Sequence, residues 1–538
     1  MNDDPGALEC APAAREGRRP TEGLLTRSLG LPGRLVPLLV AVQLLLWGAL
    51  SGYFDPAPPT DSLEQILFSQ ELRPFYVKHP ALPTWVLYAV NRVFGPSVLS
   101  TFMLGALCAA LTLLLLYAWA SKLVGAPRAA LATLLASTIV FLNVGSIQYS
   151  NNTVQLPLAM LSIILFHRAL TRGGWATWAL LGAAAGLMAL AKLSALVLFA
   201  SFAIYLLWSG RLHRLATLRW IAVAALVFGV VLAPALIAAN NVDPAAEHYM
   251  RQMMFPPEVS RAVRLLSVWD FSMAQLAAVA PALLAFMLIR RSAPSAAPAT
   301  DQSVPLAGFV TIVGFGPFII TVAAAVLSGA RLLSGWGTTF HLLLPLWLVA
   351  ASRFSVDVPR PILIRAAAVC FGVQALLWIA MMGNGGALPN LYSKAQRSAP
   401  LAPPQLADAV RRAWSAKTTV PLRYVVADIR TGAALAVAFS GSPRVVDGNR
   451  PDFTRAFTPS MQAACGFVAV TPRPPVRDRN APNYDPLDDA LNATASLEEV
   501  AFEVAGGQDR SYFIGVRPPS GQKQCDDVDP AHGTEHDL

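Results

Sequence analysis

The sequence predicts an α-helical polytopic membrane protein with a small C-terminal α/β domain. Three observations support this fold class. Of the 538 residues, 55% are hydrophobic and 14% are charged, a composition outside that of ordinary soluble globular proteins. Apolar runs of about 20 residues, long enough to cross a hydrocarbon core, recur between residues 35 and 382. After about residue 395 the chain becomes polar, and short strand-like and helix-like segments alternate.

The residues before the first apolar run (1–34) are polar and rich in arginine. No small-residue cleavage site follows Leu50, so the run is predicted to be a retained helix and residues 1–34 a cytoplasmic tail. The net charge of +9 comes mostly from arginines in short breaks between apolar runs, where positive residues mark cytoplasmic loops. The charge therefore indicates membrane orientation and no nucleic-acid partner.

Eleven helices are predicted within the membrane domain, residues 35–382. Their approximate bounds are 35–53, 97–117, 128–146, 154–170, 175–191, 193–208, 220–239, 271–289, 305–329, 338–352 and 361–382. Lys192 and Ser194 interrupt the long apolar stretch near residues 175–208, so it is divided there. A single helix would place Arg211 outside and invert every later loop, against the positive-inside rule.

With the N-terminus inside, this count places the unusual polar segments on the outer side. They are the first outer loop (54–96), the turn at Asn151 and Asn152, the Lys192 break, the loop 240–270, the turn 331–336 and the C-terminal domain. The protein is therefore predicted to lie in the bacterial inner membrane, with a cytoplasmic N-terminus and a periplasmic C-terminal domain.

The C-terminal part divides into a linker (383–420), an extracytoplasmic α/β domain (421–518) and a disordered tail (519–538). Strands are predicted at 423–428 and 443–447, in "CGFVAV" and in "YFIGV", and a helix at 432–439. Cys465 and Cys525 both fall in this polar part. Whether they form a disulfide, as an extracytoplasmic location would permit, is left open.

The first outer loop contains an unusual polar stretch, "PTDSLEQILFSQELRPFYVKHPALPTW", which no bilayer core would accept. Asp61 and Glu64 share one face of a predicted short surface helix. Asp at the N-cap with Glu at N3 forms a capping box. An acid beside cations at the outer mouth of a helical bundle is also suited to general base catalysis, and both roles remain open. Glu71, close to Arg73, is interpreted as a solvated charge.

Five further polar residues are candidates for substrate binding. Lys78 and His79 lie between aromatic and proline residues; they form either an interfacial belt or a fixed turn that presents Lys78 to an anion. Lys192 interrupts an apolar run, which favours a functional role. For Arg331 an interfacial anchor, and for Asn152 a helix cap, are equally good interpretations.

The order of several motifs resembles glycosyltransferase family 39, which includes protein O-mannosyltransferases, lipid A aminoarabinose transferases and lipopolysaccharide-core transferases. In the first loop these are Asp61, Glu64, "FYVKHP", "LPTW" and "FG". "SNNTVQLPL", "AGLMALAKLSAL" and "GARLLSGWG" are similar to the later motifs of the family. The resemblance covers most of residues 35–350, and its first-loop part is the more specific.

The resemblance implies the GT-C fold and a polyprenyl-phosphate sugar as donor. It implies that Asp61 is the catalytic acidic residue and that Lys78 and Lys192 contact the donor phosphate. Many members have adjacent Asp-Glu where this chain has Asp61 followed by serine, so either Asp61 or Glu64 takes the proton. Some relatives bind a divalent cation near this loop, but the acidic residue they place before the lysine is Val77 here, and no metal site is assigned.

The predicted function is an inverting hexosyl- or pentosyltransferase. It moves a sugar from a polyprenyl-phosphate carrier to an envelope glycolipid, lipopolysaccharide or protein on the outer face of the inner membrane. The alternatives are a transporter or lipid flippase and a non-catalytic envelope assembly protein. Transporters place substrate sites near the bilayer midplane, often between related halves. Here the charges gather at one face and no related halves are visible, which favours the enzyme.

Overall fold

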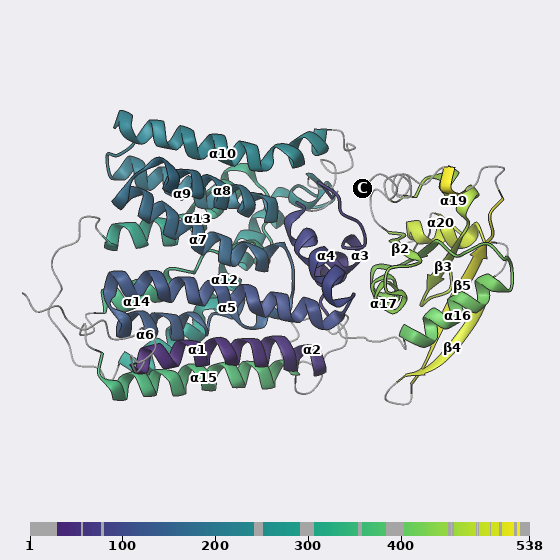
Figure 1. Cartoon of the computed structure of the whole chain (residues 1–538), viewed down its shortest axis with the longest axis horizontal. Helices are drawn as coiled ribbons and strands as arrows, with labels where there is room; N and C mark the ends of the chain where they lie inside the picture. The colour runs from purple at the N-terminus through teal and green to yellow at the C-terminus, as the bar shows by residue number, and fades with distance from the viewer. Residues whose placement is uncertain are drawn as a thin grey trace, which may run out of the picture.

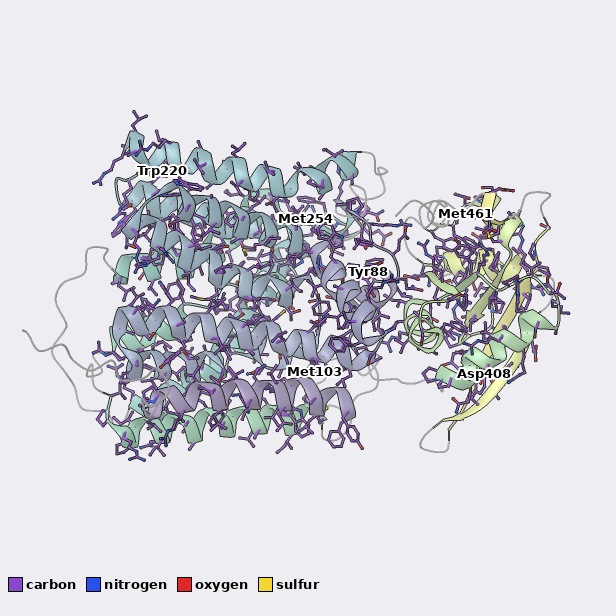
Figure 2. All side chains as sticks on the ribbon, viewed as in Figure 1. Tyr88, Met103, Trp220, Met254, Asp408 and Met461 are labelled. Atoms are coloured by element: carbon purple, nitrogen blue, oxygen red, sulfur yellow. A yellow bond between two sulfur atoms is a disulfide. The ribbon has the colours of Figure 1, made fainter. Side chains whose placement is uncertain are left out.

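The computed structural model describes residues 30–54, 58–76, 80–240, 251–290, 306–352, 358–382, 403–449, 453, 457–479, 481, 484–494, 497–504, 508–520 and 525–527. A helical bundle forms one part of the molecule and an α/β domain the other, with α3 (Thr60–Phe68) and α4 (Leu82–Phe94) between them (Figure 1). In Figure 2, Tyr88 of α4 lies in this middle layer, whereas Trp220 lies at the far end of the bundle.

The bundle has a helix at each of the eleven predicted positions. Its first span is made of α1 (Leu31–Gln43), the π-helical η1 (Leu44–Leu50) and α2 (Ser51–Phe54). The others are α5 (Val98–Val124), α6 (Ala126–Ala136) with η2 (Val140–Leu142) and η3 (Val144–Ile147), α7 (Asn151–Arg172), α8 (Trp175–Ala191), α9 (Ala195–Trp208), α10 (Leu215–Asn240), α12 (Arg261–Arg290), α13 (Leu306–Ser328), α14 (Leu344–Ala351) and α15 (Arg360–Met382).

The polytopic fold is confirmed, although fewer helices than eleven are long enough to cross a membrane. In the described part of the chain, seven helices are long and apolar enough to span, or eight if one bent pair counts as a single span. Helices α8, α9 and α14 are shorter. Apolar composition locates a helix along the chain, but packing decides how much of each run is helical.

The prediction of one straight helix at 128–146 is wrong. The chain bends by 88° after α6 and continues as short 3₁₀ turns. The Gln43 side chain donates to the Leu142 carbonyl at 2.9 Å, and Asn143 donates to the Ser137 carbonyl at 3.1 Å. Because water is absent from a bilayer core, backbone groups freed by a bend must be paired within the protein. These buried amides therefore stabilise the bend.

The C-terminal α/β domain is confirmed. Its five-stranded sheet has the order β2-β1-β3-β5-β4. The strands are β1 (Tyr424–Ala427), β2 (Arg444–Asp447), β3 (Phe467–Thr471), β4 (Leu497–Val504) and β5 (Gln508–Arg517). Strand β1 pairs in parallel with β2 and β3, whereas β5 pairs antiparallel with both β3 and β4. The helices are α16 (Pro403–Ser415), α17 (Ile429–Phe439), α19 (Pro459–Cys465) and α20 (Pro486–Asn492).

Two features of this domain go beyond the sequence prediction. Helix α16 lies in the stretch predicted as a linker, and its buried Leu406 and Val410 share an apolar cluster with α17 and the sheet. Cys465 and Cys525, whose pairing the sequence left open, form a disulfide. The disulfide ties the end of α19 to the short turn η7 (Cys525–Asp527).

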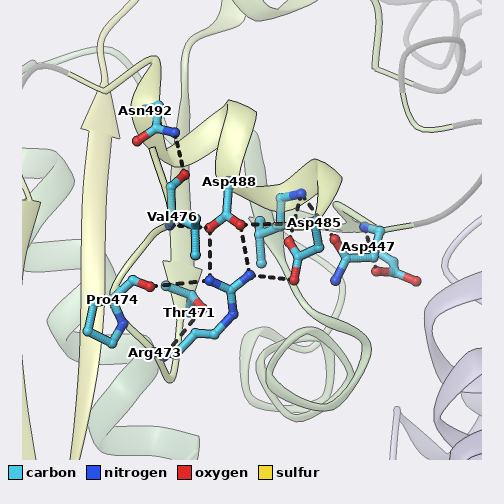
Figure 3. A network of polar contacts seen from close by, with 10 residues as sticks. Asp447, Thr471, Arg473, Pro474, Val476, Asp485, Asp488 and Asn492 are labelled. Carbon is cyan, nitrogen blue, oxygen red and sulfur yellow. Dashed lines mark hydrogen bonds and ion pairs between the residues drawn. The ribbon is translucent and has the colours of Figure 1, made fainter. Parts of the chain in front are cut away.

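A polar network closes the carboxyl end of β3 (Figure 3). Arg473 donates to Asp488 at 2.8 and 3.1 Å and to Asp485 at 2.6 Å. The Asp488 side chain has 0% exposure; it also accepts the backbone N–H groups of Val476 and Asp485, each at 3.0 Å. Burial alone raises the pKa of Asp488, but these hydrogen bonds outweigh it and hold the pKa below its usual value.

Asp488 should make the stability of this domain depend on pH. The folded-state pKa lies below that of the unfolded chain, so its contribution is complete above the unfolded value of about 3.9. It is lost as the pH falls through the folded value. We expect Asp488→Asn to lower the protection of β3 amides in hydrogen exchange at pH 7, and to weaken the further loss on acidification. Asp408→Asn, on an exposed ion pair of α16, is the matched control and should change neither.

Candidate active site

Helix α3 carries the two candidate catalytic acids. It begins after Pro59, which is the N-cap and has a φ of −55°. Asp61 therefore lies inside the first turn, and the predicted capping box of Asp61 with Glu64 is wrong. A carboxylate in the first turn still benefits from the positive end of the helix dipole.

One face of α3 is polar and attaches the helix to the start of α7. Ser62 Oγ accepts the Tyr149 N–H at 2.9 Å and donates to the Tyr149 carbonyl at 3.2 Å. Gln65 donates to Asn151 Oδ1 at 3.3 Å and accepts the Thr84 hydroxyl of α4 at 2.7 Å. Both side chains are buried, so the hydrogen bonds fix the helix in rotation as well as in position.

A different face presents the acids. At about 100° per residue, Asp61, Glu64 and Phe68 fall within one sector of the helix. Glu64 is 8% exposed, whereas Asp61 is only partly buried. Of the two, Asp61 is the one that solvent or an acceptor molecule can reach more readily.

Lys192 lies in a true break between α8 and α9, as predicted. Its backbone is extended, and its Nζ donates to Asn152 Oδ1 at 2.5 Å. Gln155 donates to the Lys192 carbonyl at 2.8 Å, and Asn151 donates to the Ala191 carbonyl at 2.7 Å. The polar start of α7 therefore pairs the carbonyls that the interrupted helix leaves open.

The charge of Lys192 is coupled to that of Asp61. Burial lowers the pKa of Lys192, and the negative charge of Asp61 opposes this shift. The ammonium group also lies 6.0 Å from the centroid of the Trp336 ring, which is the outer limit for a cation–π contact. An acid and a cation from distant parts of the chain thus face a common region at the end of the bundle.

The structure brings together some of the predicted site residues. Asp61, Lys192 and Asn152 lie at one end of the bundle, and Glu64 follows Asp61 by three residues on α3. Arg331 is exposed, and its backbone N–H donates to the Met254 carbonyl at 2.8 Å. Lys78 and His79 lie outside the described residues.

Asn152 is not a helix cap, contrary to the alternative interpretation. Ser150 is the N-cap of α7 and forms a capping box with Thr153. This leaves the Asn152 carboxamide oxygen to accept from Lys192. Its position two residues after Ser150, a good capping residue, is the sequence signal that separates the two interpretations.

Several residues that build the site were not singled out from the sequence. Buried Gln65, Asn151 and Gln155 hold α3 and the Lys192 break in place, and Tyr149 donates its hydroxyl to the Pro83 carbonyl at 2.6 Å. Amides and phenols next to apolar helices are the available signal, because buried polar groups require partners. Within the described segments no group of three or more His, Cys, Asp or Glu residues is arranged to hold a metal ion.

Residues 78–237 match the family described as dolichyl-phosphate-mannose-protein mannosyltransferase. The matched segment contains Asn152 and Lys192. This chain is similar to the solved structure of ArnT from Cupriavidus metallidurans bound to undecaprenyl phosphate, with a TM-score of 0.58 and 16% sequence identity. The match covers 92% of this chain and 100% of the ArnT chain. This chain has a GT-C-like fold. The resemblance inferred from the sequence motifs is confirmed at this level.

The apo form of the same ArnT matches this GT-C-like chain equally well, with a TM-score of 0.58, 16% identity and coverage of 91% of this chain and 99% of that one. Among curated proteins, none matches the sequence significantly. Because the similarity extends over nearly the full length of both chains, it includes the α/β domain as well as the bundle.

Proposed function

We propose that this GT-C-like protein transfers a sugar from a polyprenyl-phosphate carrier to an acceptor in the cell envelope. The observation that carries the proposal is the hydrogen bond from Lys192 to Asn152, together with the negative charge of Asp61 on α3, which acts on the same ammonium group. A GT-C-like relative is solved with undecaprenyl phosphate bound, which supports a lipid-linked donor. The lipid tail remains in the apolar phase while the sugar reaches water.

In the proposed reaction Asp61 is the general base. Its carboxylate takes the proton of an acceptor hydroxyl as that oxygen attacks the anomeric carbon of the donor sugar. The new bond joins the acceptor oxygen to the anomeric carbon, while the bond from that carbon to the phosphate oxygen breaks. Polyprenyl phosphate leaves with the bonding electrons. Attack from the face opposite the leaving group inverts the anomeric configuration. Glu64 takes the proton if Asp61 does not.

Lys192 and Lys78 are proposed to bind the donor phosphate. A phosphate is a good leaving group, so its departure needs a cation to stabilise the developing charge more than it needs an acid. Asn152 orients the Lys192 ammonium group through the 2.5 Å hydrogen bond. Arg331 and His79 complete the set of proposed binding residues.

Deleting the gene tests the proposal. We expect one hexose or pentose increment to disappear from the mass of an envelope glycolipid, lipopolysaccharide or glycoprotein, and the wild-type gene to restore it. Unchanged masses throughout the envelope would contradict sugar transfer. Lipid-linked sugar retained on the inner leaflet in the deletion strain would instead favour a flippase.

The proposed reaction also requires the site to face outwards. In a Cys10→Ser background, we expect Leu72→Cys, exposed beside α3, to react with a membrane-impermeant maleimide in intact spheroplasts. Thr171→Cys, exposed near the end of α7, is the matched control, and it should react only after permeabilisation. The reverse pattern would place the proposed base in the cytoplasm and overturn the proposal.

A further inference from the structure

The α/β domain packs against a face of α3 that carries neither acid. Leu63, Ile66 and Leu67 on this face belong to one apolar cluster with residues of α17 and β2. A Cβ placed on Gly432 of α17 would lie 3.5 Å from a Leu67 methyl. This is an ordinary van der Waals distance, so α17 packs directly on α3 at this point, and α3 is enclosed between the bundle and the domain.

The end of α3 is also paired with the edge of the sheet. Gln70 donates to the Val445 carbonyl and accepts the Val445 N–H, both at 2.9 Å. Because β2 is an edge strand, these two backbone groups have no neighbouring strand on that side. The amide side chain takes the place of a strand residue and covers an otherwise open edge.

A partly buried ion pair adds to this contact. The Glu71 carboxylate bonds to the guanidinium of Arg444 on β2 and lies 2.7 Å from that of Arg73. The interpretation of Glu71 as a solvated charge is therefore wrong. The Tyr76 hydroxyl donates to the Glu71 carbonyl at 2.6 Å and accepts the Arg73 N–H at 3.1 Å. The same contacts thus hold the turn over residues 71–76.

We propose that the α/β domain positions the acidic helix α3 for catalysis through a clamp made by Gln70, Glu71 and Arg444. This inference rests on the proposed function, in which Asp61 takes the proton. The three are positioning residues, since they act through the helix. Ser62 and Gln65 attach one side of α3 to the bundle, and the clamp attaches the other side to the α/β domain. Together they fix the rotation of α3 about its own axis and its position relative to the bundle. A misplacement of about 1 Å at a reacting group lowers a rate by about 100-fold.

The test compares Gln70→Met/Arg444→Met with Arg423→Met in the full-length protein. Arg423 pairs with Asp526 in the same domain, so it is a matched control that leaves the clamp intact. We expect hydrogen exchange of the α3 amides to rise in the double variant and not in the control. We expect kcat to fall by about 10- to 100-fold, whereas KM for the lipid-linked donor should stay within about twofold of wild type, because neither Lys192 nor Lys78 is substituted.

Two further variants keep the test decisive if the double variant folds poorly. Gln70→Met alone removes only the pair of hydrogen bonds to Val445 and should give a smaller fall in kcat with faster α3 exchange. Gln70→Met/Arg444→Lys retains a charge for Glu71 and should recover part of the kcat lost in Gln70→Met/Arg444→Met. Unchanged α3 exchange in Gln70→Met/Arg444→Met would overturn the clamp, whether or not the protein transfers sugar. An equal loss of kcat in Arg423→Met would overturn it too. If the wild-type protein transferred no sugar but the double variant still showed faster α3 exchange, the result would support the clamp and contradict the proposed function.

Discussion

Asp61→Asn should lower sugar transfer by about 100- to 10,000-fold, which is the usual contribution of a positioned general base. Asparagine has nearly the same shape as aspartate but cannot take a proton. Asp61 is not the N-cap of α3, so the helix should form normally in the variant. The measurement is transfer from a lipid-linked donor in proteoliposomes, with the unfolding temperature recorded for the same preparation.

Glu64→Gln is the matched control, because Glu64 lies on the same face of the same helix and is less exposed. Full activity in Glu64→Gln, together with an inactive Asp61→Asn, would identify Asp61 as the base. The opposite pair of results would assign the proton to Glu64. Normal transfer by both variants would contradict a carboxylate base on α3.

Lys192→Met should lower kcat/KM for the lipid-linked donor by about 10- to 100-fold, the value of one hydrogen bond to a charged group. Methionine keeps most of the side-chain length but has neither charge nor donor. Because the donor phosphate loses a cation both when bound and as it departs, KM should rise and kcat should fall. Steady-state kinetics with varied donor concentration separates the two effects.

Lys122→Met provides the control for the removal of a lysine, since Lys122 is exposed in the last turn of α5. It should retain wild-type kinetics. Lys192→Met should also express at the wild-type level, because the carbonyls at the break are paired by Gln155 and Asn151 and not by the lysine side chain. A collapse of expression or of the unfolding temperature would instead show that Lys192 has a structural role.

Much of the fold follows from local properties of the chain. Each apolar run had to cross or enter the bilayer as a helix, because a backbone without water must form its own hydrogen bonds. Lys192 marked a break because a charge within an apolar run is costly. Short apolar runs rich in valine and bounded by polar residues, proline or glycine likewise predicted β1, β2 and β3. These conclusions need only neighbours along the chain, and they agree with the structure.

Other features depend on partners that no local pattern reveals. The bend after α6 is stabilised by Gln43, which lies about 100 residues earlier in the sequence. Capping was one of the two roles open to Asp61, but the N-cap of α3 is Pro59, two residues earlier. Asn152 was as good a candidate for a cap as for substrate binding, and only the packing of α7 against α8 brings its side chain to that of Lys192.

The sequence by itself determined that the protein is a multi-helix membrane protein with an α/β domain, and that its unusual polar residues gather in a few short segments between the apolar runs. Only the tertiary structure decided which of those residues meet, and that the α/β domain holds the acidic helix through Gln70 and Arg444. The physical reason is that hydrophobicity acts on each segment separately, whereas hydrogen bonds and ion pairs act over a few ångströms between groups that folding alone brings close.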